Sequence, residues 1–143
     1  MPDDLTFKIR ILHIGVRNDS GRIYGKGVVT KGLKDFFKVQ DTLLFTTLIN
    51  DQNQESPMMS HCIATAGKKD VVIENKELTA ILTFLSPQLR TEFIQRYSTS
   101  RLGIEMFACG EIDKCRRVQN LEIKYIFVDC LEEDPIVLED KHE

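Results

Sequence analysis

Apolar and polar residues alternate along several stretches of the chain, which is the pattern of half-buried β-strands. The first such stretch, residues 5–16, alternates clearly only in its first half. A polar cluster at residues 18–21 predicts a turn, and residues 22–30 return to a strand-like composition. Gly25 and Gly27 interrupt this second strand, and glycine inside a strand usually marks a bulge or a sharp bend. We therefore expect the two strands to form a bent hairpin.

The middle of the chain adds two more predicted strands. Residues 42–49 are rich in residues with high β-propensity, and their alternation places Phe45 on an apolar face. A polar segment that ends at Pro57 separates them from residues 58–66, which form a weakly patterned strand.

The period changes at residue 76, where a helical pattern begins. Apolar residues recur at the helical spacing i, i+3, i+4 and i+7, first at Leu78, Ile81, Leu82 and Leu85 and then at Leu89, Phe93, Ile94 and Tyr97. Ser86 and Pro87 lie between the two stripes, and this pair is a favoured N-cap and first position of a helix. Residues 76–99 are therefore predicted to form two short helices that meet at a bend.

Two strands follow the helical segment. Residues 103–112 and 121–131 return to a period of two, and a polar segment between them predicts a hairpin. On the second strand one face carries Leu121, Ile123, Tyr125 and Phe127. Its opposite face is also apolar near the end, so we expect the strand to be enclosed on both sides, as in a small barrel.

Length and charge divide the chain into a body and a tail. A chain of 143 residues fits one domain, which we place at residues 1–131, followed by an acidic tail at 132–143. The tail holds six acids and one base, and removing it leaves 18 basic and 16 acidic residues in the body. Within the tail, residues 136–138 (Ile-Val-Leu) are apolar and form either a short docking element or part of a frayed end. Residues 1–40 carry eight bases and four acids, which permits a polyanionic partner.

The side chains that usually carry chemistry are few. The chain has four cysteines without CxxC spacing, which favours reduced thiols, and no apolar run long enough to span a bilayer. His61 and Cys62 are adjacent and point to opposite sides of a strand, so they do not form a zinc site. Three histidines, at 13, 61 and 142, are not placed beside a nucleophile by any motif. We expect no enzyme, no metal or other cofactor, no membrane partner and no small-molecule substrate.

The order of predicted elements gives a mainly β fold in which a helical segment lies between the third and fourth strands. This layout resembles the OB-fold, a five-stranded antiparallel barrel, over residues 24–133, here preceded by an extra N-terminal strand. Lys26-Gly27-Val28-Val29 resembles its first strand, and Phe107 to Ile112 resembles its fourth. Within OB-folds the chain is most similar to the middle subunit of replication protein A and to the related telomere-capping subunits. The Asp-Gly-Thr/Ser-Gly turn often found in that family is absent here.

The resemblance implies a non-enzymatic subunit of a heteromeric, nuclear complex that handles single-stranded DNA or protects telomeres, and that acts mainly through other protein subunits. The alternative is a stand-alone single-stranded DNA- or RNA-binding protein. A third class, a small hydrolase or transferase on an unrelated α+β fold, needs a nucleophile–base pair that the sequence does not reveal.

The OB-fold resemblance also selects candidate residues for these roles. Binding of a single strand requires exposed aromatic side chains and cations, and the nucleic-acid-binding candidates are Lys31, Lys34, Phe36, Phe37, Lys38, Phe45, Arg116, Arg117 and Tyr125. The helical segment has more apolar side chains than one barrel end requires, and the partner-binding candidates are Leu85, Leu89, Phe93, Ile94 and Tyr97. The alternative for this second set is that it plugs the barrel, and for Phe45 that it lies in the core.

Overall fold

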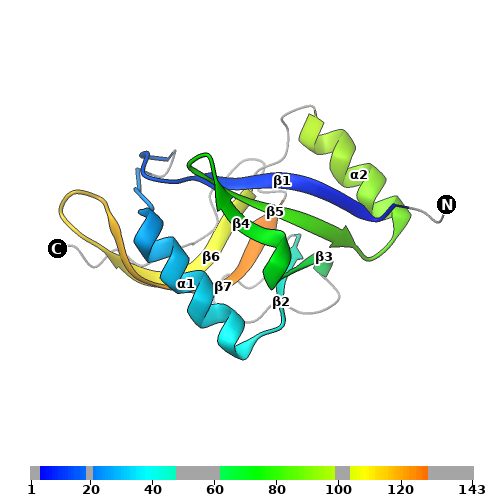
Figure 1. Ribbon diagram of the computed structural model, residues 1–143. Coiled ribbons are helices and arrows are strands. Elements are labelled where there is room, and N and C mark those ends of the chain that lie inside the picture. The colour runs from blue at the N-terminus through cyan, green and yellow to red at the C-terminus, as the bar shows by residue number, and fades with distance from the viewer. Residues whose placement is uncertain (1–3, 19–20, 48–61, 99–103, 129–143) are drawn as a thin grey trace.

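The computed structural model describes residues 4–18, 21–47, 62–98 and 104–128 (Figure 1). Seven strands, two α-helices and one 3₁₀ turn are formed by these residues. In chain order they are β1 (Thr6–His13), α1 (Lys26–Val39), β2 (Thr42–Thr46), β3 (Cys62–Gly67), the 3₁₀ turn (Lys68–Asp70), β4 (Val71–Glu74), β5 (Glu77–Phe84), α2 (Pro87–Ser98), β6 (Ile104–Ile112) and β7 (Val118–Val128).

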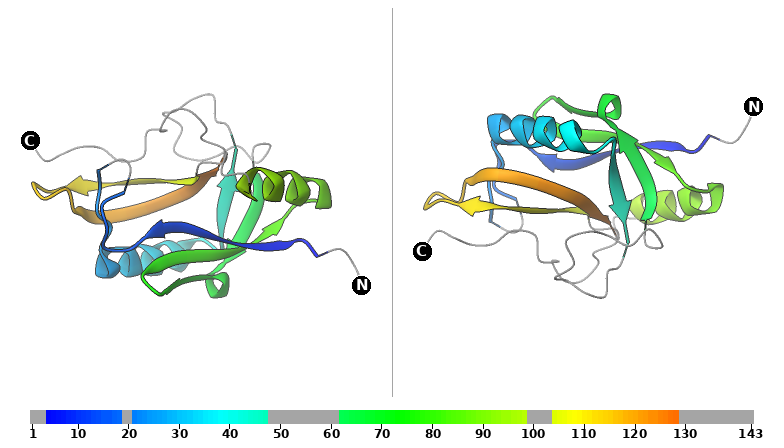
Figure 2. Two further views of the ribbon diagram at one scale, coloured as in Figure 1. Left: turned by 90° about the horizontal axis from the view of Figure 1, so that it is seen from above. Right: turned by 90° about the horizontal axis from the view of Figure 1, so that it is seen from below.

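The seven strands form one mixed sheet in the order β1-β5-β3-β2-β7-β6, and β4 pairs with β5 beside this path. All of the ladders are antiparallel except the one between β2 and β7, which is parallel. In both views of Figure 2, β2 and β3 run across the direction of β6 and β7, so the sheet bends at β2. Within the described residues no ladder joins β1 to β6, and the sheet is not closed. The prediction of a mainly β protein is confirmed, and that of a five-stranded OB barrel is wrong.

Two bulges explain why the apolar patterns of β1 and β7 change face. Ile11 is an extra residue in β1, because Arg10 pairs with Thr79 while Leu12 pairs with the next residue, Leu78. A bulge of this kind shifts the side-chain alternation by one position. It accounts for the loss of a clear face that the sequence shows in the second half of this strand.

The bulge in β7 lies at Lys124. Phe107 pairs with Tyr125, whereas Ala108 pairs with Ile123, so Lys124 has no opposite residue. Ile123 therefore faces the main core, and Tyr125 packs in a second cluster on the opposite face. The prediction that the apolar residues of this strand share one face is wrong, because it assumed an uninterrupted period of two.

Two segments adopt a different secondary structure from the predicted one. Residues 26–39 form α1, although the segment 22–30 was expected to be a strand. Its core-facing positions, Val29, Gly32, Leu33 and Phe36, follow helical spacing, and this pattern becomes visible only when the window extends past residue 30. Residues 77–84 form β5 rather than a helix, and the alternate positions Leu78, Ala80, Leu82 and Phe84 are all buried.

α1 lies against β7, and Gly32 sets the distance between them. A Cβ atom added at Gly32 would lie 3.3 Å from the Leu121 carbonyl oxygen and 3.4 Å from a methyl carbon of Ile123. A Cβ atom added at Gly27, one and a half turns earlier, would meet nothing within 4 Å. Gly32 is thus the point where α1 and β7 approach each other closely, whereas Gly27 has space for a side chain.

We expect Gly32→Val to lower the free energy of unfolding by about 1–3 kcal/mol, because the larger side chain forces α1 away from β7. Gly27→Val is the matched control in the same helix, and it should leave stability unchanged or slightly raised, since glycine is the poorer helix former. Urea unfolding followed by far-UV circular dichroism measures both variants. Equal effects at the two positions would contradict this close packing.

Candidate functional site

A concave surface of the described residues lies between α1 and β7. It is a groove of about 850 Å³. Val28, Phe36, Leu44, Leu121 and Ile123 contribute apolar surface, and polar side chains of both elements form the rest of the lining. The groove is large enough for a ligand of substantial size, since binding pockets are typically about 300–1,000 Å³.

One edge of β7, the strand beside this groove, has a strand partner over only a short part of its length. β2 pairs with β7 only through Phe45 with Ile126 and Thr46 with Phe127. The preceding part of β7, from Gln119 to Lys124, has its ladder to β6 on one side and α1 on the other. The helix covers a strand edge that would otherwise offer backbone hydrogen-bonding groups.

The outer face of α1 is basic, and three predicted cations lie there. Lys31, Lys34 and Lys38 are exposed, together with Lys26, and the helix has one acidic residue, Asp35. Lys31 Nζ lies 2.8 Å and Lys38 Nζ 3.9 Å from the Asp35 carboxylate. The hydrogen bond from Lys31 is the main cause of the lowered pKa of Asp35. A second, shallower hollow of about 590 Å³ lies among these lysine side chains.

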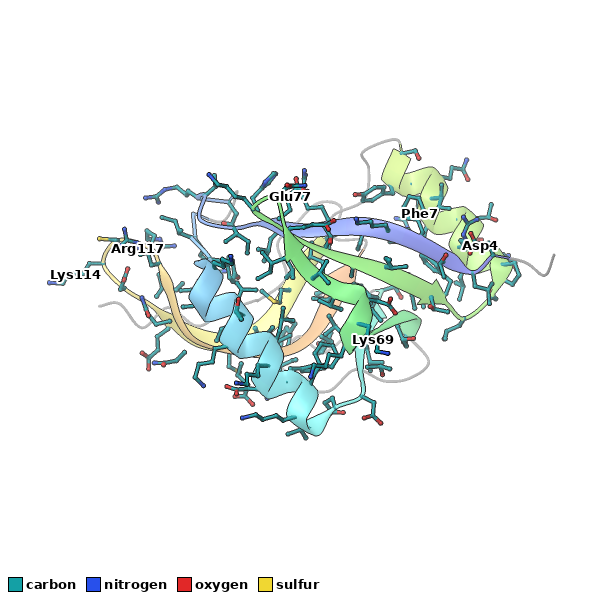
Figure 3. All side chains as sticks on the ribbon, viewed as in Figure 1. Asp4, Phe7, Lys69, Glu77, Lys114 and Arg117 are labelled. Atoms are coloured by element: carbon teal, nitrogen blue, oxygen red, sulfur yellow. The ribbon has the colours of Figure 1, made fainter. Side chains whose placement is uncertain are left out.

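The other two predicted cations lie at the β6–β7 hairpin, whose tip is marked by Lys114 and Arg117 in Figure 3. Arg116 adopts a positive φ of 69° and donates from Nε to the Gly21 carbonyl oxygen at 3.2 Å. Asp113 accepts backbone N–H bonds from Cys115 and Arg117, and the bond from Arg117 is the main cause of its lowered pKa. Arg117 is exposed, whereas Arg116 is engaged in joining the hairpin to the β1–α1 connection.

The predicted aromatic residues are buried or half-buried. Phe45 is 0% exposed and Tyr125 is 1% exposed. The Tyr125 ring stacks on Phe107 at a centroid distance of 4.7 Å, and burial raises its pKa to about 12. Phe36 and Phe37 lie on α1 rather than in a loop, pack edge to face at 5.0 Å and are both half-buried against the core. None of these rings lies open to solvent as a stacking platform requires.

The predicted partner-binding residues belong to α2 and the turn before it. Phe93 is 3% exposed and is the one buried residue of α2, where its ring lies 5.2 Å from Phe84. Leu89 and Tyr97 are half-buried against the same core, Ile94 is half-buried, and Leu85 is 54% exposed. This surface therefore covers the sheet through Phe93 and leaves Leu85 open.

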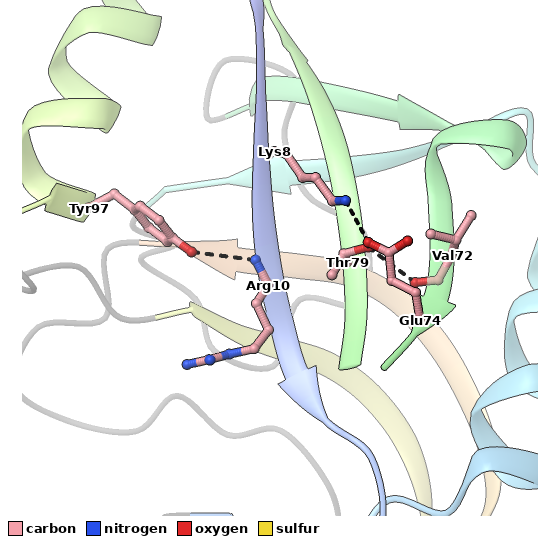
Figure 4. A network of polar contacts seen from close by, with 6 residues as sticks. All are labelled: Lys8, Arg10, Val72, Glu74, Thr79 and Tyr97. Carbon is pink, nitrogen blue, oxygen red and sulfur yellow. Dashed lines mark hydrogen bonds and ion pairs between the residues drawn. The ribbon is translucent and has the colours of Figure 1, made fainter. Parts of the chain in front are cut away.

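Polar contacts fasten the edge strand β1 to its neighbours. Figure 4 shows the backbone N–H of Arg10 donating to the Tyr97 hydroxyl oxygen at 3.4 Å, and Lys8 pairing with Glu74. The hydrogen bond from Lys8 is the main cause of the lowered pKa of Glu74, which also accepts a bond from Thr79. These hydrogen bonds and the Lys8–Glu74 ion pair connect β1 to β4 and α2, and β5 to β4.

Titratable groups that could support catalysis are sparse in the part of the chain that the structure describes. His13 Nδ1 lies 3.9 Å from the Glu77 carboxylate, near the turn that Figure 3 marks with Glu77. Cys62 is buried, donates to the Ala64 carbonyl oxygen at 3.4 Å, and has a pKa that burial raises. A raised pKa disfavours the thiolate form that a cysteine nucleophile needs. His61 and His142 lie outside the described residues.

Over residues 4–18, 21–47, 62–98 and 104–128, no group of three or more His, Cys, Asp or Glu side chains is arranged to hold a metal ion. No helix in the same ranges is long and apolar enough to cross a membrane.

The α1–β7 groove was not predicted from the sequence, because the first turn of α1 lies in the segment 22–30, which was expected to be a strand. The signal that identifies the helix is the spacing of Val29, Leu33 and Phe36, with the lysines on the opposite face.

The architecture defines a class: a bent, open, mixed sheet with one helix against β7 and a second against β1 and β5. Among solved structures, the fold is similar to that of the bacteriophage T4 capsid assembly protease gp21. The two chains align with a TM-score of 0.61 and 12% sequence identity over 84% of this chain and 77% of gp21. No protein-family model and no curated protein matches the sequence.

This likeness overturns the conclusions that depended on the OB-fold resemblance. The shared fold is that of a bacteriophage enzyme, so the expectation of a replication-protein-A or telomere-capping relative is wrong. The predictions of a nuclear location, of a role in single-stranded DNA or telomere complexes, and of a non-enzymatic protein are corrected on the same finding. The predicted binding to other protein subunits is not tested by it.

Proposed function

We propose that this chain is a peptidase that acts on polypeptides during the assembly of a virus capsid. The observation that carries the proposal is the likeness of the fold to a capsid assembly protease over 84% of the chain. Because identity is 12%, the likeness concerns the backbone, and activity has to be established on the chain itself.

The α1–β7 groove supports the same proposal. A peptidase must hold its substrate as an extended segment, and the groove combines an apolar lining from Val28, Phe36 and Leu121 with polar groups on both walls. The exposed lysines of α1 add charges that can orient a polypeptide along the helix. We therefore place the substrate-binding surface here.

The catalytic base can be found by substitution, because the chain has only three histidines. His13 lies beside the Glu77 carboxylate and outside the α1–β7 groove, so His13→Ala should leave peptidase activity unchanged and serves as the control. If an imidazole is the general base, His61→Ala or His142→Ala should lower the rate by about 10²–10⁴-fold.

The test uses the purified full chain and an unfolded polypeptide, fluorescein-labelled reduced casein, at neutral pH. We expect time-dependent release of small fluorescent fragments by the wild type and by His13→Ala. Circular dichroism confirms that each variant is folded. No cleavage by the folded wild type would refute the peptidase proposal, and full activity in all three histidine variants would exclude an imidazole base.

A further inference from the structure

The exposed side of α1 carries an unbalanced positive charge. Lys26, Lys31, Lys34 and Lys38 face solvent, and Asp35 is the single acid among them. Within the described residues Asp35 is shared by Lys31 and Lys38, while Lys26 and Lys34 have no carboxylate within ion-pair distance. Exposed charges of one sign that are this close repel one another, and an acidic partner relieves the repulsion.

Apolar surface adjoins this row of lysines. Val39, at the end of α1, is 80% exposed, which is the highest exposure among the large hydrophobic residues of the described chain. It lines the α1–β7 groove together with Phe36 and Leu44, which are half-buried. The surface therefore offers an apolar strip next to a row of cations, and a complementary ligand combines apolar residues with flanking acids.

The chain itself contains such a sequence after β7. Residues 132–140 read Glu-Glu-Asp-Pro-Ile-Val-Leu-Glu-Asp, so three consecutive apolar residues have acids on both sides. Both halves of the pattern match the surface: the apolar triplet matches the strip at Val39, and the acids match the lysines.

The geometry of the described strands brings this segment within reach. β7 ends at Val128, next to the end of β2, because Phe127 pairs with Thr46. β2 is five residues long, about 17 Å, and its first residue, Thr42, follows closely after α1. Ile136 lies eight residues beyond Val128, and a fully extended chain of eight residues spans up to about 28 Å. A short tether also raises the effective concentration of a segment to the millimolar range, so a separate acidic ligand must compete with it.

We propose that residues 132–140 dock on α1 of the same chain, with Ile136, Val137 and Leu138 against the apolar strip at Val39 and the flanking acids on the lysine row. The argument for this contact is charge and apolar complementarity within the chain and does not need peptidase activity, but the contact involves the same α1–β7 groove and lysines as the proposed substrate-binding surface.

Chemical acetylation of lysines, followed site by site by mass spectrometry, tests the docking in the full chain. Two variants change only residues 132–140. The charge variant carries Glu132→Gln, Glu133→Gln, Asp134→Asn, Glu139→Gln and Asp140→Asn, and the apolar variant carries Ile136→Ser, Val137→Ser and Leu138→Ser. Lys114 is the internal control, because it is exposed at the tip of the β6–β7 hairpin (Figure 3).

We expect Lys34 and Lys38 to be acetylated several-fold faster in both variants than in the wild type, with Lys114 unchanged. High salt should accelerate both sites in the wild type, because it screens the ion pairs. Equal rates in all three proteins would overturn the proposal, and so would a similar acceleration of Lys114. An acceleration in the charge variant alone would overturn the proposed contact of residues 136–138 with the apolar strip at Val39. Protection of the lysines that rises with protein concentration would overturn docking within one chain and assign the contact to a second copy.

Discussion

Phe93→Ala is expected to lower the free energy of unfolding by about 3–5 kcal/mol, the usual cost of removing a buried phenylalanine side chain. Phe93 is the one buried residue of α2, and its ring contacts the rings of Phe7, Phe84 and Tyr97 at centroid distances of 5.2–6.2 Å. The substitution leaves a cavity between α2 and the sheet and removes the main apolar anchor of the helix. The hydrogen bonds from Arg90 Nε to the Thr6 carbonyl oxygen and from the Arg10 N–H to the Tyr97 hydroxyl oxygen remain.

Urea unfolding measures the loss, and amide hydrogen exchange locates it. Protection should fall most in α2 and in β1, which α2 covers. Leu85→Ala is the matched control: Leu85 lies two residues before α2 and is 54% exposed, so its removal should change stability by no more than about 0.5 kcal/mol. Equal losses for the two variants would contradict the observed docking of α2.

Phe45→Ala is expected to cost a similar amount, about 3–5 kcal/mol, for a different reason. Phe45 is 0% exposed and lies in β2, opposite Ala64 of β3 on one side and Ile126 of β7 on the other. In the described chain, β2 is the strand that joins the β1-β5-β3 part of the sheet to the β7-β6 part. Truncation at Phe45 therefore weakens the packing of both parts at once.

The measurement is again urea unfolding, now followed by two probes that report on different parts: far-UV circular dichroism and tyrosine fluorescence. Val16→Ala is the control, because Val16 is an aliphatic residue that is 56% exposed. A loss below about 1 kcal/mol for Phe45→Ala would be inconsistent with a filled core at this position.

Sequence analysis located the elements whose patterns are regular. The strands expected at 103–112 and 121–131 correspond to β6 and β7, and the helix that starts at Ser86-Pro87 corresponds to α2. In these segments the period, the turn residues and the N-cap signal agree, so local sequence decides the structure.

The segments predicted wrongly are those that fit two periods. In residues 77–84 the apolar positions satisfy both helical spacing and strict alternation, and pairing with β1, β3 and β4 selects the strand. At the start of α1, β-branched residues together with Gly25 and Gly27 give a strand-like composition, whereas burial against Leu121 and Ile123 stabilises a helix. Such choices depend on tertiary contacts that a local window does not contain.

The site was not predictable for a related reason. The groove depends on the parallel pairing of β2 with β7, which are far apart in the chain, and on α1 being a helix. The OB-fold resemblance followed from the order of elements and a few glycines, and neither feature fixes which strands are neighbours. Lys31, Lys34 and Lys38 were predicted to bind nucleic acid, and this stays a prediction; the structure places them on the exposed side of a helix beside the groove.

The proposal that this chain hydrolyses peptide bonds is tested most directly by digesting an unfolded polypeptide in water enriched in the heavy oxygen isotope and analysing the products by mass spectrometry. Hydrolysis places one oxygen atom from water in the new carboxyl terminus of each fragment. We expect fragments that carry the heavy isotope after digestion with the wild-type chain. An intact substrate after prolonged incubation with the folded wild-type chain would contradict the proposal.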